Sequence, residues 1–196
     1  MQVSFNLLLS SFLLASCGGE KAPPESAPNA PSSEAAKDQG PPPTIVPEVP
    51  QNMDPVLAMY SIVDALFERP EHGATSVVVQ NCLIGIGREY SSRAPSDAEK
   101  LVAKLLQDLA GGAKFEDILR DNSNASPPGI YTVVTSGQSD MKTQTFLRGD
   151  MPKAFGDAAW RLKVGEVGIT AYDPNSQVAH GTGTSPLGMH IIKRLK

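Results

Sequence analysis

Cysteines, aromatic residues and clustered cations are all scarce in this sequence. The 196 residues include only Cys17 and Cys82, so no framework of several disulfide bonds can form. Aromatic residues make up 6% of the chain, the formal net charge is −4, and no basic patch occurs beyond Lys193, Arg194 and Lys196. A nucleic-acid partner is therefore not expected, because that function needs clustered cations with interleaved aromatics.

Patterns for metal binding, covalent catalysis and phosphate binding are also missing. His72, His180 and Asp173 lack the spacing of metal ligands, so no metal is expected. Ser185 has no acid or base near it in the sequence, which disfavours a hydrolase. The glycines of GIGRE and GTGTSPLG do not precede a helix in a βαβ unit, which excludes a phosphate loop. No cofactor is expected.

The apolar run at the N-terminus is too short to cross a membrane. Residues 5–15 are apolar at all but three positions, whereas a spanning helix needs about 20 residues. The run is typical of a signal peptide, and the tetrapeptide LASC that ends at Cys17 resembles the lipobox of bacterial lipoproteins. This resemblance implies a signal peptide over residues 1–17, acylation of Cys17, and a lipid-anchored membrane protein of the bacterial cell envelope that faces the periplasm or the exterior. A cytosolic protein with an apolar N-terminus and an ordinary cysteine is the alternative.

Residues 18–52 are rich in Pro, Ala, Ser, Glu and Gly and contain almost no large apolar side chain. Such a segment cannot bury enough surface to offset its loss of conformational entropy, so it is predicted to be disordered. We interpret it as a tether, which in an extended polyproline II conformation reaches on the order of 100 Å at ~3.1 Å per residue. A proline-rich ligand for a partner domain is the alternative.

Residues 53–70 predict one amphipathic helix, with Asp54 as its cap and Pro55 as its first residue. The apolar residues recur at helical spacing and share one face: Val56, Met59, Tyr60, Val63, Leu66 and Phe67. The polar face carries Asp64 and Glu68 instead of a row of lysines, which favours packing on the following domain over a membrane-surface helix.

Residues 74–196 predict an α+β domain that is large enough to hold a core without disulfides. The expected order is a strand over 74–87, helices over 96–110 and 115–119, a strand over 130–135, an irregular loop over 136–145, a helix from Pro152 to Leu162, and strands over 165–170 and 189–195. Ser96 and Glu99 have the spacing of a capping box at the start of the helix expected over 96–110. Along the first strand, Cys82 points to the face opposite Asn81, so it is predicted to be a small buried residue and not a nucleophile.

An ordered set of short motifs occupies the second half of this domain. They are Arg148-Gly149-Asp150-Met151, then Phe155, Gly165-Glu166 and Gly188-Met189-His190-Ile191-Ile192. The set resembles the parvulin family of peptidyl-prolyl cis/trans isomerases, and Asn81-Cys82-Leu83-Ile84 occupies the place of that family's first-strand His-Ile-Leu-Ile pattern. The resemblance covers residues 74–196 and implies a four-stranded, mostly antiparallel sheet wrapped by helices.

The resemblance also assigns candidate site residues. Met151 and Phe155 match the apolar residues that grip the substrate proline, and Leu147 and Trp160 are expected to support them. Rotation of a prolyl amide needs no cofactor and no proton abstraction, only a pocket that favours the twisted amide. The alternative is that Met151 and Phe155 only pack the core.

Two positions depart from the family pattern. His190 is the family's second histidine, whose hydrogen-bonding partner is a histidine in the family and Asn81 here. A residue that carries an acid or a thiol in the family corresponds to Ala125. An asparagine can still bond to an imidazole, so Asn81 and His190 are the candidate catalytic pair, although a buried strand histidine is also a common structural element.

Three hypotheses for function follow from the sequence. The first is a peptidyl-prolyl isomerase that assists the folding of extracytoplasmic proteins, acts on unfolded or proline-containing polypeptides, and is held at the membrane by a lipid anchor. The second is a degenerate, catalytically weak parvulin domain that acts as a chaperone or peptide-binding module. A merely structural lipoprotein is the third, and it leaves Met151, Phe155 and His190 unexplained.

Overall fold

The computed structural model describes residues 46, 52–87, 89–125, 129–176 and 183–196. The predicted signal peptide with Cys17, and nearly all of the predicted tether, lie outside the described residues. Val46, which belongs to the stretch predicted as a disordered tether, is half-buried and packs against the core. The side chain of Val46 therefore packs on the folded domain, although this position was predicted to belong to the disordered tether.

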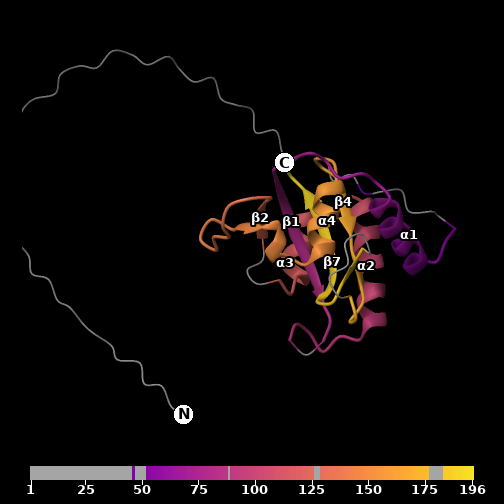
Figure 1. The fold of residues 1–196 in the computed structure, drawn as a ribbon. Coiled ribbons are helices and arrows are strands. Elements are labelled where there is room, and N and C mark those ends of the chain that lie inside the picture. Colours follow the sequence, from indigo (N-terminus) through magenta and orange to yellow (C-terminus); the bar gives the residue numbers. More distant parts are fainter. Residues whose placement is uncertain (1–45, 47–51, 88, 126–128, 177–182) are drawn as a thin grey trace, which may run out of the picture. The chain divides into compact units, whose positions relative to one another are not determined.

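The described part of the chain contains a five-stranded sheet (Figure 1). Its strands, in spatial order, are β3 (Thr145–Leu147), β2 (Gly129–Val134), β1 (Ser76–Gly85), β7 (Gly188–Arg194) and β4 (Val167–Ile169). All neighbours are antiparallel except β2 and β3, which are parallel. A separate parallel pair joins β5 (Ala171–Tyr172) and β6 (Thr184–Ser185). The predicted α+β class and mostly antiparallel sheet are confirmed, but the count of four strands is too low because β3 adds an edge strand.

β1 and β7 form the centre of the sheet and are buried along almost their whole length. Their register pairs Leu83 with His190 and Cys82 with Ile191. Because successive side chains of a strand point to opposite faces, Cys82 and Ile191 face one core cluster while Asn81 and His190 face the other side. Cys82 is 0% exposed, which confirms its predicted buried position, and burial raises the pKa of its thiol to about 12.

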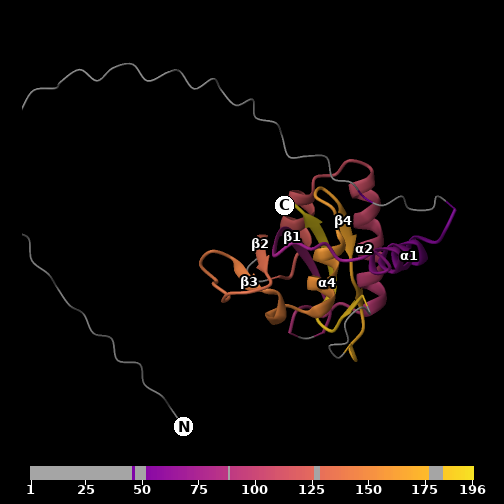
Figure 2. The ribbon, with the colours of Figure 1, turned by 45° about the horizontal axis from the view of Figure 1, so that its top comes forward.

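Helices pack on both faces of this sheet. They are α1 (Pro55–Phe67), α2 (Pro95–Ala110), α3 (Phe115–Asn122) and α4 (Lys153–Arg161), with a 3₁₀ turn η1 (Arg148–Asp150) before α4. Side chains of α2 and α3 belong to the core cluster on the Cys82 face, and those of α4 belong to the cluster on the other face. Figures 1 and 2 both show α1 beside α2. Among the described residues, no helix combines the length and the apolar character needed to cross a bilayer.

The starts of α1 and α2 differ in how well the sequence predicts them. Asp54 caps α1 as expected, because its carboxylate accepts the main-chain N–H groups of Val56 and Leu57 at 2.9 and 3.2 Å. The predicted capping box of α2 is wrong. The helix starts at Pro95 and its cap residue makes no side-chain bond. Glu99 instead accepts the Tyr60 hydroxyl at 2.6 Å and links α2 to α1.

Candidate functional site

A pocket lies on the α4 side of the sheet, beside the centre of β1 and β7. Its volume is about 360 Å³, within the range of small-ligand sites. The described residues that line it are Asn81, Leu83, Glu89, Tyr90, Asn124, Ala125, Tyr131, Met141, Phe146, Met151, Pro152, Leu187 and His190.

Asn81 and His190 form the buried end of this pocket. The two residues lie on neighbouring strands, where the pairing of Leu83 with His190 places Asn81 diagonally across from the histidine on the same face. Asn81 Oδ1 is 3.1 Å from His190 Nδ1, and both side chains are almost completely buried. The structure therefore brings together the two residues that the sequence predicts as a pair.

Two hydroxyl groups hold the histidine from its other sides. Ser185 Oγ lies 3.1 Å from His190 Nε2 and accepts the main-chain N–H of Leu187 at 3.3 Å. Thr170 Oγ1 accepts the main-chain N–H of His190 at 3.1 Å. Because an amide oxygen can only accept, Nδ1 donates to Asn81 and Nε2 accepts from the Ser185 hydroxyl. The imidazole is thus fixed in one tautomer and one orientation.

Burial lowers the pKa of His190 to about 4. Taking a charged imidazolium out of water is costly, and no carboxylate from the described part of the chain bonds to either ring nitrogen to offset that cost. The ring is therefore neutral at pH 7.

Ser185 corrects one expectation from the sequence. His190, only five residues away in the chain, was not expected to serve it as a base, yet the fold places Ser185 within hydrogen-bonding distance of His190, whose far nitrogen bonds to Asn81. This order of groups is that of a serine nucleophile, a base and an orienting residue. However, Ser185 is fully buried and is not among the residues that line the pocket, so it serves to hold the imidazole. No group of three or more metal-binding side chains occurs among the described residues.

An aromatic and thioether wall adjoins the histidine. Met151 and Phe146 are half-buried and line the pocket together with Tyr131. The Tyr131 ring packs edge-on against Phe146, with ring centroids 5.3 Å apart. Phe146 and Tyr131 are not among the site residues predicted from the sequence.

Phe155 lies one layer below the pocket. Its side chain is 0% exposed and is not part of the lining, and its ring centroid is 5.5 Å from that of the His190 imidazole. The predicted direct grip by Phe155 is therefore replaced by support of the His190 ring from within the core. The structure places Met151 in the pocket and Phe155 in the core.

Leu147 and Trp160 also lie away from the pocket lining. Adjacent residues of a strand point to opposite faces, so β3 can turn only one of Phe146 and Leu147 toward the pocket, and it turns Phe146. The Trp160 indole N–H donates to the carbonyl of Ala74 at 2.9 Å and thereby fixes the segment before β1. Neither residue contributes directly to the site.

Part of the remaining wall is polar. Asn124 Oδ1 accepts the main-chain N–H of Gly85 at 3.0 Å and lies 3.4 Å from the guanidinium of Arg93. Ala125 lines the pocket, as expected from its position in the family pattern, and brings neither an acid nor a thiol. Glu89 supplies the carboxylate of the described lining.

A network of ion pairs fixes the segment that carries Met151. Arg148 donates to both carboxylate oxygens of Glu71 at 2.9 and 2.8 Å and to Asp157 at 2.6 Å. The hydrogen bonds from Arg148 lower the pKa of Glu71. Gly156 lets this guanidinium approach α4, because a Cβ there would lie 3.1 Å from Arg148 Cγ. Arg148 thus anchors η1, and Met151 directly follows η1.

No protein-family model and no curated protein sequence matches the chain. Among solved structures, the chain is similar to peptidyl-prolyl isomerase ESS1 from Candida albicans, with 21% sequence identity and a TM-score of 0.42. The similarity covers 71% of this chain and 74% of that chain.

Proposed function

We propose that the protein is a parvulin-type peptidyl-prolyl cis/trans isomerase that assists the folding of extracytoplasmic proteins. The observation that carries the proposal is the neutral His190–Asn81 pair at the end of a pocket that also contains Met151. These three residues are far apart in the sequence and occupy positions that the family pattern singles out, with Asn81 in place of the family's histidine. Their convergence on one pocket supports a site that binds proline.

The proposed chemistry follows from the rotation barrier of the prolyl amide. That barrier is about 18 to 20 kcal/mol, because rotation breaks the conjugation between nitrogen and carbonyl. The twisted amide is less polar than the planar amide, so an apolar pocket that strips water from the carbonyl favours it. Each ~1.36 kcal/mol by which the protein stabilises the twisted state more than the planar one raises the rate tenfold.

Each group of the pocket has a part in this mechanism. Met151, Phe146 and Tyr131 surround the proline ring and exclude water from it. The His190 ring, held by Asn81 and Ser185, forms a rigid neutral surface beneath the amide. No proton moves, so the rate is expected to be insensitive to pH wherever the protein stays folded.

A prolyl-peptide isomerisation assay tests the proposal. The protein with Cys17→Ser, which prevents acylation, should accelerate cis/trans exchange of a short proline peptide. Met151→Ala should lower kcat/KM by about tenfold, because it removes apolar contact with the proline ring. Val164→Ala is the matched control, since Val164 is exposed and lies outside the pocket. If the protein neither binds nor isomerises proline peptides, the proposal is wrong.

Ala125 favours a second candidate function, a chaperone or peptide-binding module with weak turnover. The pocket wall contains a methyl group where the family has an acid or a thiol, and Asn81 replaces a histidine. A preorganised polar group near the substrate carbonyl is worth roughly 3 kcal/mol in other enzymes, so its loss can lower the rate by orders of magnitude. Peptide binding, which depends on the apolar wall, is unaffected by that loss.

A double variant separates the two functions. Asn81→His combined with Ala125→Asp should raise the isomerisation rate without much change in peptide affinity, because the restored groups act on the twisted state. If neither the wild type nor this variant isomerises peptides while both bind them, the binding-module function is the correct one.

We also propose that Cys17 is acylated and holds the protein at a membrane of the cell envelope. The lipobox-like LASC sequence supports this, and Cys17 lies outside the described residues. Two or more acyl chains suffice for stable anchoring, since each buried CH₂ contributes ~0.8 kcal/mol. Cys17→Ser should move the protein from the membrane fraction to the soluble fraction. An unchanged fractionation would rule out the anchor.

A further inference from the structure

Two further cavities continue the proposed proline pocket along the side of η1. The first has a volume of about 260 Å³ and shares Met151, Pro152 and Leu187 with the proline pocket. The second has a volume of about 390 Å³ and shares Gly149 and Lys153 with the first. Cavities that share walls adjoin one another, so the three together form a groove, the η1 groove, that runs from the proline pocket to Lys153.

The far end of the η1 groove contains an excess of positive charge. Arg148, Lys153 and Asp157 line the second cavity, and Lys153 and Asp157 share one face of α4 because they are four residues apart. Asp157 is almost fully buried and accepts the Arg148 guanidinium at 2.6 Å. Glu71 accepts hydrogen bonds from both Arg148 and Arg161. This network thus combines three cations with two carboxylates, which leaves one positive charge in excess.

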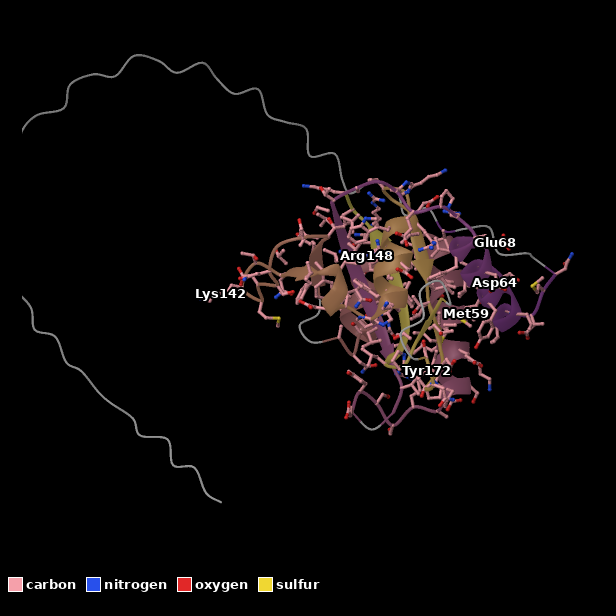
Figure 3. The ribbon with its side chains drawn as sticks, viewed as in Figure 1. Met59, Asp64, Glu68, Lys142, Arg148 and Tyr172 are labelled. Carbon is pink, nitrogen blue, oxygen red and sulfur yellow. The ribbon has the colours of Figure 1, made fainter. Side chains whose placement is uncertain are left out.

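The acidic residue of η1 is directed away from this cluster. Asp150 accepts the Ser139 hydroxyl at 2.6 Å and lines neither of the two cavities. Lys153 is half-buried, and Figure 3 shows Arg148 well inside the outline of the domain, between Lys142 at the left and helix α1 at the right. Water and salt screen a half-buried ammonium less than one on a fully exposed face. The excess charge therefore belongs to the wall of the groove.

The cavity between the two ends connects them over a short distance. Ser176 and Thr184 line it together with Met151 and Pro152. The Ser176 hydroxyl donates to the carbonyl of Thr184 at 2.9 Å, which fixes the position of this wall. An extended chain advances ~3.3 Å per residue, so a residue about two to four positions from a bound proline reaches Lys153.

We propose that the far end of the η1 groove binds an acidic side chain of the substrate, about two to four positions from the proline, through Lys153. This inference rests on the proposed isomerase function and names its substrate class: extended, proline-containing segments that carry Asp or Glu at this distance. Arg148 already bonds to Glu71 and Asp157, so the contact is assigned to Lys153. A carboxylate there meets the excess cation, and hydrogen bonds between ionised groups are stronger than those between neutral groups.

Matched peptides and variants of the full chain with Cys17→Ser test this subsite. Each peptide has one proline and one Glu, placed about two to four positions before or after the proline, and its partner has Gln at the same place. The chain should bind at least one Glu peptide about fivefold more tightly than its Gln partner, and high salt should reduce this preference. Lys153→Gln should abolish the preference and change the affinity for the Gln peptide by less than about twofold. Lys153→Arg should retain the preference.

Lys100→Gln is the matched control, because it removes one positive charge from an exposed position of α2, on the other face of the sheet. It should leave the preference unchanged, and thermal unfolding should show that every variant is folded. The subsite is wrong and the proposed function stands if proline peptides bind without a preference for Glu. The same conclusion follows if Lys153→Gln keeps the preference, or if Lys100→Gln removes it equally. If the chain binds no proline peptide at all, the proposed function itself fails, and the subsite with it.

Discussion

The buried imidazole of His190 makes the stability of the fold sensitive to acid. Its pKa falls from 6.5 to about 4 on folding, so between these values the unfolded chain binds more protons than the folded chain. The free energy of unfolding should therefore fall as the pH decreases from 6.5 to 4, by about 3 kcal/mol at most from this residue. His190→Gln should show a smaller loss over this window in urea unfolding measured at pH 7, 5.5 and 4. Parallel pH dependences of the two proteins would contradict the assignment.

Phe155 and Met151 should respond differently to truncation, because one lies in the core and the other in the pocket. Phe155 is fully buried against Tyr131 and His190, so Phe155→Ala should lower the free energy of unfolding by about 3 to 5 kcal/mol. Compared with Phe155→Ala, Met151→Ala should lower the free energy of unfolding by less and reduce the affinity for proline peptides by more. Denaturant unfolding and peptide titration of both variants measure the two effects. Equal stability losses would contradict the placement of Met151 in the pocket.

At the scale of single elements, the close contact of β7 with β1 depends on Gly188. Its φ is +141°, and a Cβ at this position would lie 2.3 Å from the main-chain oxygen of Ile84. Gly188→Ala should therefore destabilise the protein by about 2 to 4 kcal/mol and disturb the adjacent His190. Gly149→Ala is the control, because a Cβ there meets no atom within 4 Å. Similar thermal unfolding of the two variants would contradict this account of the β1–β7 contact.

At the scale of the whole molecule, α1 belongs to the folded domain, although it precedes the segment that resembles the parvulin family. Met59, Ile62, Val63 and Leu66 of α1 are almost fully buried in the two core clusters. Their burial contributes about 6 to 12 kcal/mol, which is comparable to the whole stability of a typical domain of about 5 to 15 kcal/mol.

Residues 52–196 should therefore fold alone, whereas residues 70–196 should be unfolded or aggregated in circular dichroism and sedimentation experiments. Leu57→Ser provides the control, because Leu57 lies on the exposed face of α1 and its replacement leaves both core clusters intact. A folded and stable 70–196 fragment would show that α1 is dispensable.

The sequence by itself determined the features that depend on local pattern. The capped start of α1 at Asp54 follows from a short-range hydrogen bond, and the buried position of Cys82 follows from alternation along β1. Asn81 and His190 could be paired in advance because the order of motifs indicated the family pattern. The α+β class follows in the same way from the order of strand-like and helical segments.

Only the tertiary structure decided which side chains meet in the pocket. β3 is three residues long and has no sequence pattern of its own, so its register on β2, which turns Phe146 inward and Leu147 away, depends on a long-range pairing. Ser185 and His190 are close in sequence, but their bond depends on the turn between β6 and β7. Met151 lies just before α4 and Phe155 lies in its first turn. Only the packing of α4 on the sheet buries Phe155 and leaves Met151 at the pocket. Met141 reaches the site because hydrogen bonds within its loop, and one from Ser139 to Asp150, fix that loop, and such contacts leave no periodic signal in a sequence.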